Sequence, residues 1–449
     1  MDILLVISAG MLLLSGGYFT VKFKLFYLLH PIKTLTSFSK DGVGQMLLSL
    51  GGTVGVGNIV GVSVAIALGG SGAVFWMWCG AAVAMALKYA EIILGMLHGN
   101  TLNYIKSAFG GKAAALFALL LVADAIVMGG IIQSSAVAQT MELSFGLSRV
   151  VCGVFFCLCV ALVFFLKLDL FKLSAKVVPV MSIGYALAAL WVVAANFDKI
   201  PSVVQSIFQN AFCTESATGG IFGFLFTPAL RQGIVKGLFS NEAGCGTAPM
   251  AHAASKEKVP ARQGLFGIFE VFADTLCMCT LTAFAILLTG GGNAYGMRAC
   301  INAFESVLGA FAAPLLSASV LLFAFCTVIS LGYYGLQSIL YLGGSESGCF
   351  LTVYCISVFV GATLSPSLAW AIADAVVSIM LIVNTCAVLV LHREIIASHN
   401  LFYCQMGNAS QRAFKMRSLC RAFSKKESPM SHSDIKRGSI PKSRQNLAK

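Results

Sequence analysis

The sequence has little charge for its length. Only 11% of its 449 residues are Asp, Glu, Lys or Arg, whereas 58% are apolar, and the mean hydropathy is +0.87. A water-soluble protein of this size needs a charged surface that this composition does not supply. The composition therefore excludes a soluble enzyme and predicts a protein that crosses a membrane many times.

Metal-binding and catalytic motifs are also missing. The 15 cysteines include no C-x-x-C pair, since Cys157 and Cys159, like Cys277 and Cys279, are separated by one residue, and the six histidines form no HExxH motif. Cysteines scattered through apolar segments are typical of packing thiols. We therefore predict no metal site, no catalytic nucleophile and no resident cofactor, so the chain is not expected to be an enzyme.

Long apolar runs, by contrast, are abundant. A helix that crosses a bilayer needs about 20 mostly apolar residues. The first run lacks the basic start and small-residue cleavage site of a signal peptide, because its first basic residues, Lys22 and Lys24, follow it; we interpret it as a retained helix. Ten runs have membrane length, at residues 3–20, 44–68, 72–97, 113–140, 150–166, 177–196, 264–289, 314–342, 350–367 and 369–391.

An eleventh span is predicted at residues 227–254, although it contains Arg231, Lys236 and Glu242. With eleven spans and the N-terminus outside, 24 of the 30 Lys and Arg residues fall on the cytoplasmic side, as the positive-inside rule requires. Omitting this span would place the basic loop at 255–263 and the basic tail outside. Thr227 and Pro228 also form a typical helix start, with a capping residue before a proline at the first helical position.

The tail from residue 393 holds 12 basic and three acidic residues and few apolar ones near its end. Such a composition predicts a disordered cytoplasmic segment near anionic lipid. A nucleic-acid arm is the alternative, but no folded module or interleaved aromatic residues accompany the charges. We predict no nucleic-acid partner.

Two of the spans contain helix breakers. Gly51, Gly52, Gly55 and Gly57 interrupt the second span, and residues 241–246 (NEAGCG) interrupt the seventh, at 227–254. Irregular backbone at membrane depth persists only where it lines a cavity or binds something. A helix that restarts near Asn58 would leave the amides of residues 56–58 unpaired, with the positive end of the helix dipole beside them, and could hold a carboxylate without an arginine.

Two other readings of the glycines were weighed. They could merely allow close helix packing, as small residues do in membranes. They could also form a nucleotide-binding fingerprint, but the spacing is wrong and no strand precedes them. The second interruption favours a transport site over packing alone.

Several motifs together resemble the alanine/glycine:cation symporter family, over about residues 17–391. They are GTVGVGNIVG at 52–61, AIALGG at 65–70, FWMW at 75–78, KYAE at 88–91, GLFSNEAG at 237–244, AP at 248–249 and DT at 274–275. The resemblance implies an all-α membrane protein with about 11 helices and the LeuT-type fold, in which two inverted five-helix repeats follow one extra N-terminal helix. The implied divisions are 1–43, the repeats 44–196 and 197–392, and the tail 393–449.

The resemblance also implies where ligands bind, since sites in such folds lie where broken helices meet at the midplane. The amides of the first break would hold the substrate carboxylate, and carbonyls near the second would hold its ammonium group. The implied substrate residues are Thr53, Gly55, Val56, Gly57, Asn58, Gln133, Phe239, Ser240, Asn241, Thr327 and Leu331. The implied sodium residues are Gly51, Val54, Phe323, Cys326 and Thr327.

The chain departs from the family pattern in the ninth span, which reads FAFCTVISL at 323–331. Cys326 stands where the family has serine, and a thiol is a poor ligand for a hard cation. Weakened sodium coupling, with a proton or another cation substituting, is therefore our hypothesis. Leu331 stands where many members have tryptophan, about one helical turn beyond Thr327, so a larger pocket and larger substrates are expected.

Acids inside membrane spans are costly and therefore candidate functional groups. Asp274 and Asp374 match acids common in the family, and either a structural role or ion binding is open. Glu270 lies one turn before Asp274, so the two could carry a proton, and Asp124 is a further, unassigned candidate. The cationic Arg231 and Lys236 are expected to face an outer vestibule or to pair with Glu242 or lipid phosphate.

The predicted function is uptake of small neutral amino acids, alanine or glycine first and D-alanine or larger ones next, by cotransport with sodium across a bacterial plasma membrane. Proton coupling is the closest alternative. A passive channel would need a continuous polar lining that is not visible. A membrane-embedded enzyme is third, but its catalytic motifs are missing, and a transporter-like sensor is a further alternative. The predicted partners are the amino acid, the cation and the lipid bilayer, whereas the sequence does not fix the oligomeric state.

Overall fold

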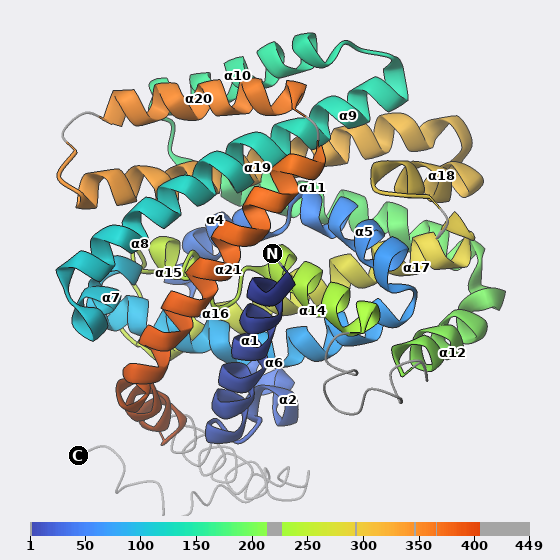
Figure 1. Ribbon diagram of the computed structural model, residues 1–449. Coiled ribbons are helices and arrows are strands. Elements are labelled where there is room, and N and C mark those ends of the chain that lie inside the picture. The colour runs from blue at the N-terminus through green and yellow to red at the C-terminus, as the bar shows by residue number, and fades with distance from the viewer. Residues whose placement is uncertain (1, 213–226, 292–293, 345–346, 365, 405–449) are drawn as a thin grey trace, which may run out of the picture. The chain divides into compact units, whose positions relative to one another are not determined.

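The computed structural model describes residues 2–212, 227–291, 294–344, 347–364 and 366–404, and these residues are almost entirely helical (Figure 1). The chain divides into a unit of residues 1–398 and a unit of residues 399–449. No strand occurs in the described ranges. The predicted all-α class is confirmed. The tail was predicted to be disordered from residue 393, but residues 393–404 are helical, and the rest, from residue 405, lies outside the described residues.

The first half of the main unit follows the predicted spans. Its helices are α1 (Asp2–Lys22), α2 (Phe26–Leu29), α3 (Pro31–Thr36), α4 (Val43–Thr53), α5 (Val60–Gly69), α6 (Gly72–His98), α7 (Thr101–Phe109), α8 (Gly111–Asp124), α9 (Gln133–Phe145), α10 (Arg149–Phe165), α11 (Leu170–Ala195) and α12 (Ile200–Ala211). Short 3-10 turns occur at Lys40–Gly42, Val56–Asn58 and Phe197–Lys199, and a π-helical segment, Ala125–Ile132, joins α8 to α9.

The second half repeats this pattern of a broken helix followed by long ones. Its helices are α14 (Pro228–Asn241), α15 (Ala248–His252), α16 (Pro260–Val271), α17 (Thr280–Leu288), α18 (Met297–Leu308), α19 (Ala312–Tyr341), α20 (Ser347–Thr363) and α21 (Pro366–Val390). A second π-helical segment, Phe272–Cys279, joins α16 to α17, and a 3-10 turn, Gly309–Phe311, precedes α19.

Seven described helices are long and apolar enough to cross a membrane, or eight if the bent pair α4 and α5 forms one span. Two shorter apolar helices, Arg149–Phe165 and Gly348–Thr363, match two further predicted spans. The broken helix at 227–254 does not meet this criterion of length and apolar character, as we expected from its three charged residues. The count of eleven therefore stays a prediction.

Close packing between α6 and α14 forms part of the centre of the main unit. A side chain at Gly233 of α14 would overlap the carbonyl oxygen of Ala73 in α6, so only glycine allows this approach. Small residues at such contacts are how helices pack in membranes. Helix α14 begins as predicted, with Thr227 as its N-cap and Pro228 in its first turn, although the Thr227 side chain makes no capping hydrogen bond.

The extra N-terminal helix α1 packs against α6 and α21 (Figure 1). Gly16 lies so close to α6 that an added Cβ would sit 2.6 Å from the Val83 carbonyl oxygen. On the other side, the Ser8 hydroxyl donates to Ser378 Oγ of α21 at 3.3 Å. Helix α1 is thus packed into the bundle between α6 and α21.

Candidate functional site

The first break lies between α4 and α5, whose axes are bent by 55°. Helix α4 continues through Gly51 and Gly52 to Thr53, so the break covers residues 54–59 and is shorter than the predicted 51–58 at its start. The Asn58 side chain stabilises it, since its Oδ1 accepts a hydrogen bond from the Gly55 amide at 2.8 Å. The predicted discontinuity is confirmed, and its glycine-rich start is helical.

Two of the three amides expected to be unpaired have partners. The Val56 amide donates to Gln133 Oε1 at 3.4 Å, and the Asn58 amide donates to the Gly55 carbonyl at 3.2 Å. The expectation for Asn58 is therefore wrong, because the 3-10 turn uses its amide. The long bond from Val56 is weak, so the amides of Val56 and Gly57 remain the ones that a carboxylate can take.

The two breaks face each other. A Cβ added to Gly57 would lie 3.5 Å from the Cα atom of Ser240 and 3.9 Å from the Phe239 carbonyl oxygen. Asp274 of the second π-helical segment joins them, because Asn58 Nδ2 donates to its Oδ1 at 2.7 Å and Ser240 Oγ donates to its Oδ2 at 2.8 Å. The sequence left two roles open for Asp274, a structural one and ion binding. Its buried carboxyl links the two breaks, which is the position that a structural role requires.

The second break begins where Glu242 takes the left-handed conformation, with φ 52°, and ends α14. Its polar backbone is held by side chains from other helices. Glu91 accepts from the amides of Gly244 (3.3 Å) and Gly246 (3.1 Å), and Lys88 Nζ donates to the Asn241 carbonyl at 2.8 Å. The Asn241 carbonyl, expected to face the substrate ammonium group, is thus already paired.

Sequence reasoning assigned no role to Lys88 and Glu91. Both are completely buried and lie one turn apart on α6. The available signal was the KYAE motif itself, in which two charged residues interrupt a run of membrane length. Such residues are costly in a bilayer unless they bond to one another or to irregular backbone.

Four of the five predicted cation residues, all except Val54, meet where α19 packs against α4. Thr327 Oγ1 donates to the carbonyl oxygens of Gly51 and Phe323, each at 3.1 Å. Cys326 lies on the same contact, since a Cβ added to Gly51 would be 3.4 Å from Cys326 Cβ. Ser330, one turn further along, donates to the Leu48 carbonyl at 2.7 Å and was missed by the sequence reasoning.

Leu331 is also buried, but it packs against the first π-helical segment rather than facing a cavity. Its Cβ is 3.0 Å from the position of a Cβ added to Gly129, in the first π-helical segment. Leu331 lines neither of the two cavities beside the first break. Gln133, by contrast, reaches the break through its bond to Val56.

Glu270 and Asp274 do not form a pair. Glu270 Oε2 lies 3.2 Å from Lys88 Nζ and accepts from Ser49 Oγ at 2.8 Å, while its Oε1 is 2.7 Å from His252 Nε2. Asp274 instead bonds to the two breaks. The arrangement gives the two acids different partners, although they lie one turn apart in sequence.

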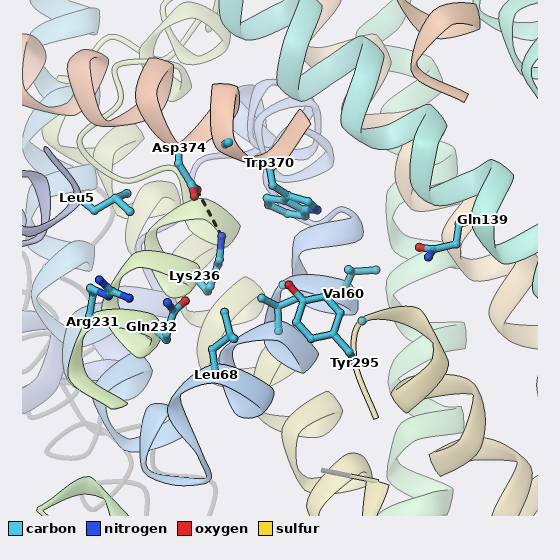
Figure 2. A pocket seen from close by; sticks show the side chains of 14 residues that line it. Leu5, Val60, Leu68, Gln139, Arg231, Gln232, Lys236, Tyr295, Trp370 and Asp374 are labelled. Carbon is cyan, nitrogen blue, oxygen red and sulfur yellow. Dashed lines mark hydrogen bonds and ion pairs between the residues drawn. The ribbon is translucent and has the colours of Figure 1, made fainter. Parts of the chain in front are cut away.

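A cavity of about 540 Å³ opens beside the first break, and Figure 2 shows its side chains. Arg231 and Lys236 line it, and Lys236 Nζ pairs with Asp374 Oδ1 at 3.3 Å rather than with Glu242. The ammonium group also lies over the rings of Phe239 (4.8 Å) and Trp370 (4.7 Å). Aromatic faces attract cations, so Lys236 is held at this wall.

A second cavity, of about 20 Å³, shares Val60, Gln139 and Trp370 with the first and reaches Val56. Lys236 and Asp374 line the larger cavity, and Val56 of the first break lines the smaller one. Ligand sites in bundles of this kind lie between helices and in such concave, mostly apolar places. The geometry describes a route to a backbone site built from two broken helices.

A family model described as the sodium:alanine symporter family matches residues 2–416. This chain belongs to the sodium:alanine symporter family. The resemblance seen in the motifs is confirmed, and the family places the chain among sodium-coupled amino-acid transporters of the plasma membrane, which are not enzymes.

Several relatives match this chain over most of their own length. The putative sodium/proton-dependent alanine carrier protein YrbD of Bacillus subtilis is 36% identical and is matched over 79% of each chain. The probable sodium/glutamine symporter GlnT of the same bacterium is 32% identical, over 86% of this chain and 85% of its own. The sodium/alanine symporter AgcS of Methanococcus maripaludis is 30% identical, over 80% and 83%.

Solved structures show the same fold at low sequence identity. MhsT in complex with L-phenylalanine superposes with a TM-score of 0.60 at 13% identity, covering 81% of this chain and 92% of that one. A manganese transporter from Eremococcus coleocola gives 0.54 at 13% identity, over 79% and 77%. The predicted LeuT-type fold of the transporter is confirmed.

Proposed function

We propose that this protein takes up a small neutral amino acid, alanine or glycine, together with sodium. The observation that carries the proposal is the juxtaposition of the two broken helices, with Gly57 beside Ser240 and Phe239. Broken helices that meet inside a membrane supply amides for an anion and carbonyls for a cation. A zwitterionic amino acid has both groups.

The substrate carboxylate would bind the Val56 and Gly57 amides, with Gln133 released from its long bond to Val56. The ammonium group would bind the carbonyls of Phe239 and Ser240. Thr53, Gly55, Asn58, Thr327 and Asn241 complete the proposed surroundings, whereas Leu331, packed against Gly129, is not part of them. A Cβ at Gly55 would lie 2.6 Å from Thr327 Oγ1, so the break is in close contact with α19 at this point.

Sodium would bind at the contact of α4 with α19, through the carbonyls of Gly51, Val54 and Phe323 and the Thr327 hydroxyl. Two of these carbonyls already converge on Thr327 Oγ1. Cys326 lies at the same contact and offers sulfur in place of oxygen, which a hard cation binds poorly. Weak sodium binding is therefore part of the proposal, and no resident cofactor is needed.

Alternating access would come from the bundle that holds both broken helices rocking against the remaining helices around this site. We assign residues 44–196 and 197–392 to the two inverted repeats, after the first helix at 1–43 and before the tail at 393–449. The cavity with Lys236 and Asp374 would be the outer entrance. The N-terminus would then lie outside the cell and the tail inside.

The proposal is tested by uptake of labelled alanine into proteoliposomes that contain the full-length protein. An inward sodium gradient should drive accumulation, and unlabelled alanine inside should accelerate entry of label. A passive channel gives no such acceleration. Binding of alanine without uptake would indicate a sensor, and the absence of both binding and uptake would contradict the proposal.

A further inference from the structure

A third cavity, of about 220 Å³, shares no residue with the two cavities beside the first break. Its walls come from α2 and α3 on one side and from α6, α16 and the second π-helical segment on the other. Ten residues line it, of which eight are apolar and none is charged. We refer to this cavity as the α2 groove.

The two polar side chains of the α2 groove, Tyr27 and Thr34, are already bonded to the protein. Tyr27 Oη donates to the Ala82 carbonyl at 2.9 Å, and Thr34 Oγ1 donates to the His30 carbonyl at 3.1 Å. A polar ligand placed here would lose hydrogen bonds to water without gaining replacements, which costs free energy. The groove therefore suits a hydrocarbon chain and does not suit an amino acid.

The α2 groove opens to the surface of the helical bundle. Leu28 of α2 and Phe272 of the π-helical segment both line it, and they are 48% and 45% exposed. Leu25 and Leu29, the neighbours of Leu28 along the chain, are exposed as well. Exposed apolar side chains that gather in one place mark a surface that contacts a membrane or a partner.

A basic turn leads into this apolar surface. Residues 22–40, which include α2 and α3, hold four lysines and no acid. Lys22 ends α1, Lys24 lies in the turn to α2, and both side chains are exposed. Lys24 and Leu25 have positive φ angles of 54° and 51°, a strained conformation for residues with side chains. Lysines beside exposed leucines are typical of segments that bind anionic lipid at a membrane surface.

We propose that the α2 groove binds one acyl chain of an anionic phospholipid, whose phosphate group is held by Lys22 and Lys24. The apolar lining and its opening to the bundle surface select the hydrocarbon chain, and the lysines select the charge of the headgroup. A neutral lipid would use the groove alone, and a free phosphate ion would use the lysines alone. An anionic phospholipid matches both features.

The bound chain also supports the second π-helical segment. Phe272 and Leu276 of this segment line the groove. Asp274 lies between them in sequence but is completely buried, and it accepts hydrogen bonds from Asn58 and Ser240 of the two breaks. The lipid thus contacts the exposed side of the element that joins the breaks. Since this contact exists only in the folded protein, the lipid should stabilise the fold.

The first test addresses the headgroup and uses native mass spectrometry of the full-length protein in detergent. The protein is mixed with phosphatidylglycerol or with phosphatidylcholine that has the same acyl chains, and one phosphatidylglycerol should stay bound under conditions that remove phosphatidylcholine. Lys22→Gln combined with Lys24→Gln should weaken this binding about thirtyfold, because each lysine near an anionic surface contributes about 1 kcal/mol and one decade is about 1.4 kcal/mol. The matched control is Lys106→Gln combined with Lys112→Gln, two exposed lysines of α7 and α8.

The second test addresses the acyl chain. Leu276→Trp places a large ring in the α2 groove, and Leu158→Trp, the matched control, changes an exposed leucine of α10 outside it. Phosphatidylglycerol should raise the thermal midpoint of the wild type and of Leu158→Trp, measured by circular dichroism, but not that of Leu276→Trp. If Leu276→Trp does not fold, the lysine variants still decide the proposal.

Several outcomes would overturn the proposal. Equal retention of the two lipids by the wild type would remove the anionic headgroup as the selected feature. Phosphatidylglycerol binding that persists in both the lysine double variant and Leu276→Trp would place the lipid elsewhere. Stabilisation by inorganic phosphate equal to that by the lipid would make a free ion the ligand, and lipid-free dimers would show that a second copy covers the groove. None of these measurements depends on alanine transport.

Discussion

At the scale of single residues, Lys88 forms a fully buried ion pair beside the second break. Its ammonium group joins the Glu270 carboxylate and the Asn241 carbonyl, and both side chains of the ion pair are 0% exposed. Removing one member of a buried pair strands the other charge, which costs about 3–5 kcal/mol. The residue therefore links the stability of the protein to the shape of the break.

Lys88→Met is accordingly expected to lower the free energy of unfolding by about 3–5 kcal/mol. The double variant Lys88→Met with Glu270→Gln should lose less than the sum of the two single changes, because no charge is then stranded. Chemical unfolding in detergent, followed by circular dichroism, measures all four proteins. Additive losses would show that the two groups do not interact.

The sulfur atom of Cys326 determines how well this side chain can bind sodium. Its side chain adjoins Gly51 in the proposed cation site, and replacing sulfur by oxygen provides a ligand that sodium prefers. Cys326→Ser should therefore lower the sodium concentration that gives half-maximal alanine uptake. Equal sodium dependence of the wild type and the variant, measured at limiting sodium, would place the ion elsewhere.

At the scale of elements, the break between α4 and α5 depends on the absence of a side chain at Gly55. An added Cβ would lie 2.6 Å from Thr327 Oγ1 and 3.5 Å from Gln133 Oε1. The backbone of the break and helix α19 could then not keep their present separation. This contact joins the proposed substrate site to the proposed cation site.

Gly55→Ala should therefore reduce both alanine affinity and sodium affinity at least tenfold, a difference of about 1.4 kcal/mol. The matched control is Gly184→Ala in α11, where a Cβ meets no atom within 4 Å. There, alanine in place of glycine should stabilise the helix by up to about 1 kcal/mol. Isothermal binding measurements and uptake distinguish the two, and unaltered affinities in Gly55→Ala would contradict the geometry.

The loop between α15 and α16 contains a titratable contact outside the membrane spans. Burial raises the pKa of the Glu257 carboxyl, but hydrogen bonds from Ser39 and the Val259 amide and the charge of Arg262 outweigh it, so the pKa lies below its usual value. Arg262 Nη1 lies 3.6 Å from Glu257 Oε2. A carboxyl with a lowered pKa adds stability at neutral pH that is lost on acidification.

We expect the thermal midpoint of the wild type to fall as the pH decreases from the usual carboxyl pKa of 4.5 toward the lower value in the folded protein. Glu257→Gln should have a lower midpoint at pH 7 and a flatter profile in this range. Differential scanning fluorimetry in detergent gives both profiles. Parallel profiles for the two proteins would remove Glu257 as the cause.

At the scale of the whole molecule, the distribution of basic residues predicts the orientation. A reporter that fluoresces only in the cytoplasm should be fluorescent when it is fused after residue 37, 258 or 398. A phosphatase that is active only in the periplasm should be active when it is fused after residue 148. The reason is that Lys and Arg are retained on the cytoplasmic side of the membrane. Cytoplasmic fluorescence after residue 148 would reverse or alter the proposed topology.

Much of the architecture could be predicted because it depends on local sequence. The long spans follow from apolar runs, α14 starts at its predicted Thr-Pro pair, and both breaks occur at their glycines. The two π-helical segments were not predicted, nor were the helices α7, α12 and α18 outside the spans. The wider winding of a π-helix depends on contacts with neighbouring helices, so the local sequence does not reveal it. The short helices lack the apolar length by which a span is recognised.

Within the site, the sequence by itself determined the membrane class, the family and the two broken helices, since glycine content and hydropathy act within a few residues. Only the tertiary structure decided the partners: Lys88 with Glu270, Asp274 with both breaks, Lys236 with Asp374, and Asp124 with no donor among the described residues. These groups are far apart along the chain. Their pairing follows from helix packing, which brings costly charges together in a medium without water.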